Sequence, residues 1–294
     1  MLAEQIVNGL VMGSLYALIA QGYTLVFGVL DKLNFAHGEI FMLGGYVVVA
    51  GVALGASIPL ALLLAILACG ILGLLVELVS FRKFRSHDAH ITAALSSFAF
   101  GLVILDLVQK GWGTQPVAIE LPQALRVANV QFFDLRFSLV KLAILALALL
   151  LMISMHLAIA RTRLGRSIRA VAESPTSAAL YGIDVTRVIQ IVFLLASAMA
   201  GVAGVALAIR TGFASSEVGF TLGIKALAIM AIGGMGDLRG AFLGGLLVGV
   251  FEALAFQWGL GQLADTGVWL FMIVVLLVRP TGLFAARATK EARA

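Results

Sequence analysis

Three polar side chains that could perform chemistry stand close together near the start of the chain. The stretch LNFAHGEIFMLGGY places Asn34, His37 and Glu39 between two long apolar runs. An imidazole near a carboxylate can transfer protons or ligate a metal ion. In a membrane, the same groups can instead cap the broken ends of two helices, or contact a transported solute as part of a pathway or hinge. The residues alone leave these uses open.

Signatures of catalysis are absent from the rest of the sequence. It contains no GxxxxGK phosphate loop followed by Ser or Thr, no HExxH and no GxSxG. The single cysteine, Cys69, lies in an apolar run and can form no internal disulfide, so we expect it to be a small buried hydrophobe. We therefore expect a protein that is not an enzyme and that needs no cofactor or metal ion.

The composition indicates where these polar residues must lie. The 294 residues are 62% hydrophobic and 12% charged, with a mean hydropathy of +1.09. Soluble domains are typically about 45–50% apolar and about 25% charged. Apolar runs of about 20 residues, enough to span bilayer hydrocarbon, recur along the whole chain. The chain is an integral membrane protein without room for a separate soluble domain.

The order of these runs predicts a single all-α membrane domain covering residues 1–294, with about eight or nine transmembrane or re-entrant helices. Pro59 divides the long run 40–76 into two crossings, because proline suits the start of a helix. The segment 111–138 contains two prolines and the alternating stretch VQFFDLRF, which predict an extramembrane excursion with a short strand pair. The other expected spans are 5–30, 91–108, 139–160, 188–209, a glycine-rich pair around GGMGDLRGAFLGG, and 268–278.

The distribution of basic residues predicts the orientation. The loop around Arg82, the loop 161–187 and the C-terminal tail hold three, five and four of the 20 Lys and Arg residues. Cytoplasmic loops carry an excess of Lys and Arg, so all three segments are expected in the cytoplasm. The excursion 111–138 and the N-terminus then lie outside. The segment with Asn34 falls on the cytoplasmic side or re-enters the membrane from it.

Two segments have patterns that suggest more than a simple connection. In the loop 161–187, Ser174 and Pro175 predict a helix start and Gly182 predicts its end. The helix between them would expose a small apolar docking surface, although an ordinary amphipathic connector fits the pattern equally well. That surface consists of Ala178, Ala179, Leu180 and Tyr181.

The second segment is GGMGDLRG, with Gly233, Gly234 and Gly236. Glycines continue at every fourth position to Gly240 and Gly244, which favours close helix packing. Consecutive glycines beside Asp and Arg also predict a helix break at membrane depth, facing protein or a water-filled pathway. The segment around His37 would be its counterpart in the other half of the chain.

Several segments together resemble the permease subunits of branched-chain amino acid ABC transporters, the LivH-like family for high-affinity uptake of hydrophobic amino acids. The resemblance is carried by NGLVMGSLYALIAQGYTLVFGVLDKLNFAHGEIFMLGGY, RAVAESPTSAALYGIDVTRV, KALAIMAIGGMGDLRGAFLGGLLVGVFEAL and RPTGLF. It implies a bacterial inner-membrane permease that pairs with a second, related permease. Two cytoplasmic ATP-binding subunits and an extracytoplasmic substrate-binding protein would complete the importer.

The resemblance also implies residue roles. The family's loop that matches Glu173 to Gly182 seats in a groove of the ATPase, so the coupling residues are expected to be Glu173, Ala178, Ala179 and Gly182. The expected cargo is a branched-chain or other hydrophobic amino acid. Permeases for urea or short amides resemble the same family and stay open as an alternative.

A self-sufficient channel or ion-coupled carrier is an alternative from another class. Its signature would be ionisable residues buried within the spans. The candidates for such residues all fall near the predicted ends of spans, which weakens this alternative. They are Glu77, Asp106, Glu252 and Asp265.

Overall fold

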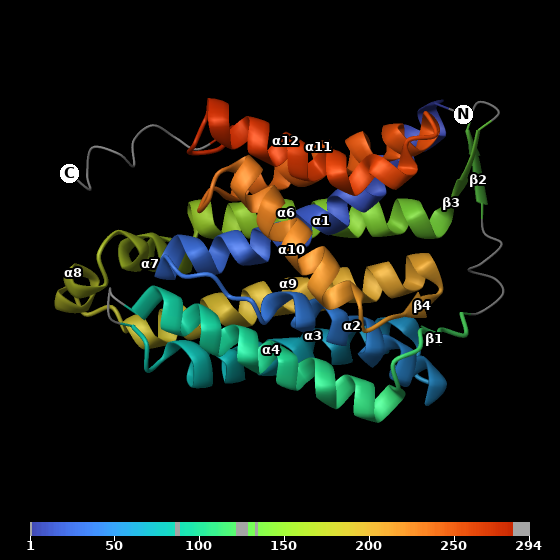
Figure 1. Ribbon diagram of the computed structural model, residues 1–294. Helices are drawn as coiled ribbons and strands as arrows, with labels where there is room; N and C mark the ends of the chain where they lie inside the picture. Colours follow the sequence, from blue (N-terminus) through green and yellow to red (C-terminus); the bar gives the residue numbers. More distant parts are fainter. Residues whose placement is uncertain (1, 86–88, 122–128, 133–134, 285–294) are drawn as a thin grey trace.

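The computed structural model describes the whole chain except residues 1, 86–88, 122–128, 133–134 and 285–294, and shows a bundle of long helices (Figure 1). In the described residues, seven helices are long and apolar enough to cross a membrane, and two shorter apolar helices accompany them. The prediction of an all-α fold with eight or nine such helices is confirmed. The seven are α1 (Leu2–Leu30), α3 (Ile58–Val76) with the π-helical turn η1 (Glu77–Phe81), α4 (His90–Trp112), α6 (Leu139–Arg161), α9 (Val185–Thr211), α11 (Leu238–Gln257), and α12 (Ala264–Val278) after the 3-10 turn η3 (Gly261–Leu263).

The shorter apolar helices are α2 (His37–Ala53) and α10 (Val218–Gly233). Both begin inside the bundle, as the site geometry below shows. Pro59 lies at the start of α3, as predicted, and a short turn separates α3 from α2.

The two ends of the bundle differ (Figure 1). At one end, called the strand end, β2 (Asn129–Phe132) pairs antiparallel with β3 (Leu135–Ser138), which confirms the predicted strand pair. At the same end β1 (Val117–Ala118) pairs with β4 (Phe213–Ala214). At the other, called the α8 end, lie α7 (Arg163–Glu173) and α8 (Pro175–Leu180). Part of the excursion 111–138 and most of the basic C-terminal tail lie outside the described residues.

Small residues let the first helix pack closely on a helix from the end of the chain. An added Cβ at Gly13 of α1 would lie 2.8 Å from the carbonyl oxygen of Gly245 in α11, and one at Gly9 would lie 2.9 Å from the carbonyl oxygen of Gly249. The hydrophobic effect does not drive helices together in lipid. The van der Waals contact that this close backbone approach allows is therefore a main stabiliser of the helix pair. Gly244 faces α10 instead, 3.1 Å from the Ile229 carbonyl oxygen by the same measure. The predicted close packing is confirmed for Gly240 and Gly244, which face α10, whereas Gly236 lies in the turn before α11.

The helices α2, α3 and α9 form a second closely packed group. Cys69 of α3 is fully buried and fills the space left by Gly201 of α9, where an added Cβ would lie 2.9 Å from the Cys69 sulfur. This confirms the prediction of a small buried hydrophobe. In contrast, α3 and α6 expose large apolar side chains such as Leu67, Ile71, Leu150 and Ile153, a composition suited to lipid contact.

Candidate functional site

The six residues between α1 and α2, residues 31–36, run back into the bundle (Figure 1). Their first residue lies at the start of α4, where the Asp31 carbonyl oxygen is 2.8 Å from His90 Nδ1. Ala36 lies against Gly101, the middle residue of α4. Eleven residues of helix separate His90 from Gly101, or about 16 Å. The structure therefore has the re-entrant form of this segment, and α2 begins near the middle of the bundle.

Asn34 satisfies the backbone at this broken helix end. Its Oδ1 accepts a hydrogen bond from the Ala36 amide at 3.2 Å, and its carbonyl accepts one from the His37 amide at 3.3 Å. The Phe35 amide donates to Ser97 Oγ of α4 at 3.0 Å. An interior backbone group without a partner is costly, so these bonds are what permit the break. Asn34 therefore caps the backbone at the start of α2.

His37 is a packing residue in this structure. It is fully buried, and its ring meets the ring of Tyr23 edge-on with 4.6 Å between centroids. Gly22 of α1 leaves the room that the imidazole fills, because an added Cβ there would lie 2.6 Å from His37 Cε1. Within the described ranges, no group of three or more His, Cys, Asp or Glu side chains is placed to hold a metal ion.

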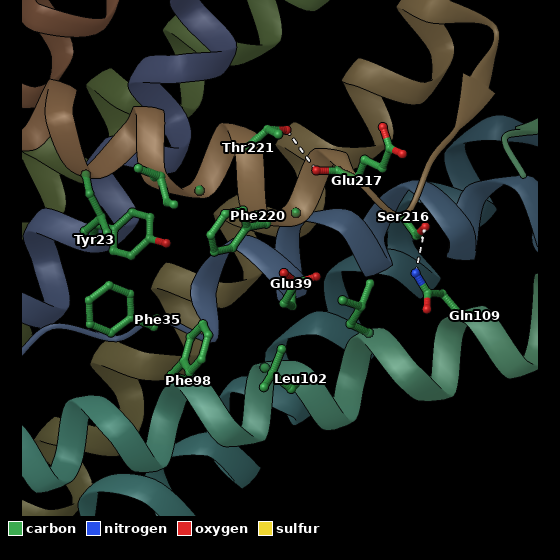
Figure 2. Close-up of a pocket in the computed structure, with 16 residues that line it drawn as sticks. Tyr23, Phe35, Glu39, Phe98, Leu102, Gln109, Ser216, Glu217, Phe220 and Thr221 are labelled. Carbon is green, nitrogen blue, oxygen red and sulfur yellow. Dashed lines mark hydrogen bonds between the residues drawn. The ribbon is translucent and has the colours of Figure 1, made fainter. Parts of the chain in front are cut away.

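Glu39, two residues further along α2, faces a cavity of 420 Å³ lined by residues of α1, α2, α4 and α10. Figure 2 shows its carboxylate between Leu102 of α4 and Phe220 of α10. Most of the wall is apolar, and polar groups lie at one side, where Gln109 Nε2 donates to Ser216 Oγ at 3.3 Å. The lining includes Phe35, Glu39, Phe98, Leu102, Gln109 and Glu217.

The carboxylate of Glu39 is almost fully buried, and among the described residues it has no hydrogen-bond donor for Oε2. The residue is 7% exposed, and its buried Oε2 accepts no hydrogen bond from any described residue. Gly219 of α10 makes room for it, since an added Cβ there would lie 2.8 Å from Glu39 Cδ. Gly101 lies on another side, 3.4 Å from Glu39 Cγ by the same measure.

The helix α10 also begins inside the bundle, beside Glu39. Residues 212–217 reach this point from the strand end, where Ala214 of β4 pairs with Val117. Gly38 and Gly223 allow the two helices to touch, because an added Cβ on Gly38 would lie 3.0 Å from Gly223 Cα. The starts of α2 and α10, approached from opposite ends of the bundle, thus meet next to the cavity. Sequence reasoning missed this second break, although the polar stretch ASSEVG between apolar runs resembles FAHGE in pattern.

The predicted break at membrane depth in GGMGDLRG is wrong in its position. Gly233 ends α10, and Gly234 and Gly236 have φ angles of +114° and +88°, so these residues form a tight reversal between α10 and α11. The reversal lies at the α8 end, where an added Cβ on Gly236 would be 3.6 Å from Gly28 near the end of α1. Glycines with positive φ complete a turn between two antiparallel helices at little cost, which is what the pattern encodes here. The Phe284 amide donates to the Gly233 carbonyl at 3.1 Å and closes this turn.

The predicted helix in the loop 161–187 is present as α8. Ser174 Oγ accepts from the Ser177 amide at 3.2 Å, which starts the helix. Gly182, with φ of +79°, ends it, and the Ile183 amide donates to the Ala178 carbonyl at 3.0 Å. This is the bonding of a Schellman motif, which favours glycine at the left-handed position.

The exposure of α8 differs in part from the expected docking surface. Leu180 and Tyr181 are 84% and 88% exposed, whereas Ala178 is only 3% exposed. Successive residues of a helix point about 100° apart, so four consecutive residues cannot all face outward from a helix packed on α7 and α9. Glu173, Ala179 and Gly182 are exposed as expected.

Polar contacts connect this region to the re-entrant segment. Arg85 Nη1 donates to Thr186 Oγ1 in the first turn of α9 at 2.8 Å, and Arg85 Nη2 lies 2.7 Å from Glu77 Oε1. The Lys32 ammonium donates to the Phe84 carbonyl oxygen. Burial lowers the pKa of Lys32 below its usual value, and Asp31 opposes that shift. A chain of contacts therefore runs from the residues after α8 to the start of the re-entrant segment.

A second buried acid lies toward the strand end, and its partner was not anticipated. Lys225 Nζ of α10 lies 2.7 Å from Glu252 Oε1 and 2.6 Å from Asp265 Oδ1. The Tyr16 hydroxyl donates to Glu252 Oε2 at 2.7 Å. A single lysine within the apolar run TLGIKALAIMAIG was the available signal, because intramembrane charges need partners.

The ionisable residues weighed for a channel or carrier are accounted for by ion pairs. Glu77 is fully buried with Arg82 and Arg85, and Glu252 is buried with Lys225. Asp106 pairs with Lys110 at an exposed position.

Known proteins of one family match this chain over nearly its whole length. The model of the family described as "Branched-chain amino acid transport system / permease component" matches residues 5–278. The permease BraD of a high-affinity branched-chain amino acid transport system from Pseudomonas aeruginosa is 35% identical, covering 95% of this chain and 94% of the relative. The corresponding LivH of Escherichia coli K12 is 33% identical, with the same coverage. A probable LivH of Methanocaldococcus jannaschii is 26% identical over 94% of this chain and 90% of the relative. No solved structure matches the chain.

Proposed function

Because this chain belongs to the family of branched-chain amino acid transport permeases, we propose that it forms one half of the membrane pathway of an ATP-driven importer of branched-chain or other hydrophobic amino acids. The family match over residues 5–278 carries the proposal. Permease subunits of this family have no catalytic activity of their own. The 420 Å³ cavity beside Glu39 supports the proposed transport of a small solute, since pockets of about 300–1,000 Å³ suit small-molecule ligands.

The remaining parts of the importer are separate chains in this proposal. A second, related permease forms the other half of the pathway, and two ATP-binding subunits supply the energy. An extracytoplasmic binding protein delivers the solute. The α8 end lies in the cytoplasm and the strand end outside, in a bacterial inner membrane, because the three basic segments hold twelve of the 20 Lys and Arg residues. The N-terminus is then outside and the C-terminus inside.

The loop 161–187 couples the permease to the ATP-binding subunit. Glu173, Ala179 and Gly182 supply exposed contacts, Leu180 and Tyr181 extend them, and buried Ala178 supports the helix that carries them.

From this loop, movement reaches the pathway through Thr186, Arg85 and Lys32, the contacts that join α9 to the re-entrant segment. Asn34, His37 and Glu39 form the hinge of the pathway at the end of that segment. Gly233, Gly234 and Gly236 form a second hinge, at the reversal between α10 and α11.

Reconstitution in liposomes tests the function. We expect ATP-dependent uptake of labelled leucine only when this chain is combined with its partner permease, both ATP-binding subunits and the binding protein. Uptake by this chain alone would contradict the importer and support a self-sufficient channel or carrier.

Paired substitutions test the coupling loop. We expect Leu180→Asp with Tyr181→Asp to leave the assembled membrane subunits intact and to reduce uptake at least about tenfold, because a surface contact worth about 1.4 kcal/mol or more is lost. Gly182→Arg should uncouple ATP hydrolysis from uptake. Gly182→Ala is its control, because it introduces the same backbone strain, about 1–2 kcal/mol, without bulk at the interface. Normal uptake by Gly182→Arg would remove this residue from the coupling surface.

A further inference from the structure

The charged side chains that line the cavity between α1, α2, α4 and α10 are all acidic. Glu39 and Glu217 line it, and no Lys, Arg or His among the described residues does. The buried Glu39 Oε2 accepts no hydrogen bond from a described residue, whereas the buried acids Glu77 and Glu252 each contact a cation. An enclosed carboxylate oxygen without a partner is costly in an apolar site, and a hydrogen-bonding cation would relieve that cost.

We propose that Glu39 receives the ammonium group of the transported amino acid in this cavity. The proposal rests on the amino-acid import proposed above and names the contact that recognises the solute within the membrane. A primary ammonium has three donors, and the Glu39 carboxylate that lines the cavity has an Oε2, packed against Gly219, that accepts no hydrogen bond from a described residue. Gly219 and Gly101 set the position of the carboxylate by leaving room on two sides of it.

The rest of the cavity suits the rest of such a solute. Phe98 and Leu102 of α4 and Phe35 of the re-entrant segment form an apolar wall for an aliphatic side chain. The Gln109 side-chain amide lies at the polar side of the same cavity and offers donors to a carboxylate. Since the anchor is an acid, the ammonium is the group that the site requires, and urea, which lacks one, does not satisfy it.

Cysteine protection measures this contact without the binding protein, whose own selectivity would hide it. The only native cysteine, Cys69, is buried, and a Cys69→Ala background leaves no thiol in this chain. A Leu102→Cys reporter places a thiol in the cavity wall, and a Leu95→Cys control places one on an exposed part of the same helix. Maleimide labelling of this chain is followed by mass spectrometry in the purified complex with the second permease and the ATP-binding subunits.

Three probes separate the groups of the solute. We expect leucine and 3-methylbutylamine, which carry an ammonium, to slow labelling of Leu102→Cys. We expect 4-methylpentanoate, which has a similar carbon chain but no ammonium, to have no effect. None of the three should change labelling of Leu95→Cys. Equal protection by 4-methylpentanoate, or no protection by leucine, would overturn the proposal.

Variants at Glu39 assign the effect to its charge. Glu39→Gln should raise the leucine concentration for half-protection about 10-fold to 100-fold, the loss expected for one charge-assisted hydrogen bond. Glu39→Asp, which keeps the charge, should retain part of the protection and serves if Glu39→Gln does not assemble. Asp106→Asn, at an exposed position of α4 outside the cavity lining, is the matched control and should shift protection less than threefold.

Unchanged protection in Glu39→Gln refutes the contact even if the wild-type complex imports leucine. Absence of ATP-driven uptake by the wild-type complex refutes the proposed function instead, so the two failures are distinguishable.

Discussion

Glu39 and Glu252 are equally buried, each 7% exposed, yet their surroundings are opposite. Glu252 has a lysine ammonium at 2.7 Å on one oxygen and a tyrosine hydroxyl at 2.7 Å on the other. Glu39 faces a cavity and leaves Oε2 without a hydrogen bond from the described residues. Burial of an acid in a membrane therefore does not by itself mark a functional site. The presence or absence of a built-in counter-charge distinguishes the two.

The largest expected effect tests the paired acid. Lys225→Met leaves Glu252 buried without its cation. We expect the free energy of unfolding to fall by about 3–5 kcal/mol, the usual cost of removing one partner of a buried ion pair. Thermal unfolding of the detergent-solubilised protein measures this loss.

The double variant Lys225→Met with Glu252→Leu removes both charges and should recover most of the stability. If the single variant is as stable as wild type, Glu252 does not depend on Lys225, and the contrast with Glu39 fails.

The next effect tests how closely the helices around the cavity are built. An added Cβ on Gly38 would lie 3.0 Å from Gly223 Cα and 3.2 Å from Gly219 C, both backbone atoms that cannot move alone. We therefore expect Gly38→Ala to cost about 1–3 kcal/mol of stability through overpacking.

Gly45 on the same helix provides the control. An added Cβ there would meet its nearest atoms at 3.4–3.6 Å, which is ordinary contact. Gly45→Ala should unfold within a few degrees of wild type, and equal losses for both variants would show that general helix packing, rather than the meeting of α2 with α10, is being measured.

The smallest expected effect concerns the unpaired acid and has the opposite sign. Glu39→Gln removes a buried carboxylate whose Oε2 accepts no hydrogen bond from the described residues, so we expect no loss of stability and a gain of up to about 1 kcal/mol. The same substitution at Glu252 should be destabilising. A clear loss in Glu39→Gln would mean that the native fold supplies Glu39 with a stabilising partner.

Hydrophobic patterning predicted the helices well because membrane thickness fixes their length. The start of α8 was also predictable, since Ser174, Pro175 and Gly182 act on their own local backbone. The sequence could not show how deep in the bundle each polar segment lies. The residues around Gly234 and those around Glu217 are both polar and glycine-containing, but only packing against α2 places the second set inside the bundle.

The site was only partly predictable for the same reason. Asn34, His37 and Glu39 are adjacent in sequence, but one caps, one packs and one faces the cavity, a division that depends on α1, α4 and α10. Ala178 turned inward because α8 packs on its neighbours. Lys225 could be recognised as unusual, but its partners come from three other elements.

The packing of α1 on α11 also has a consequence for biosynthesis. The small-residue face of the first helix made, with Gly9 and Gly13, has its partner in a helix that ends at Gln257. At about 5–20 residues per second, a ribosome needs roughly 10 to 50 seconds to make the intervening chain. During that interval α1 remains in the bilayer with its small-residue face in contact with lipid or with an insertion factor instead of α11. Newly made chains that terminate before α11 would leave the Gly9 and Gly13 face of α1 without its packing partner.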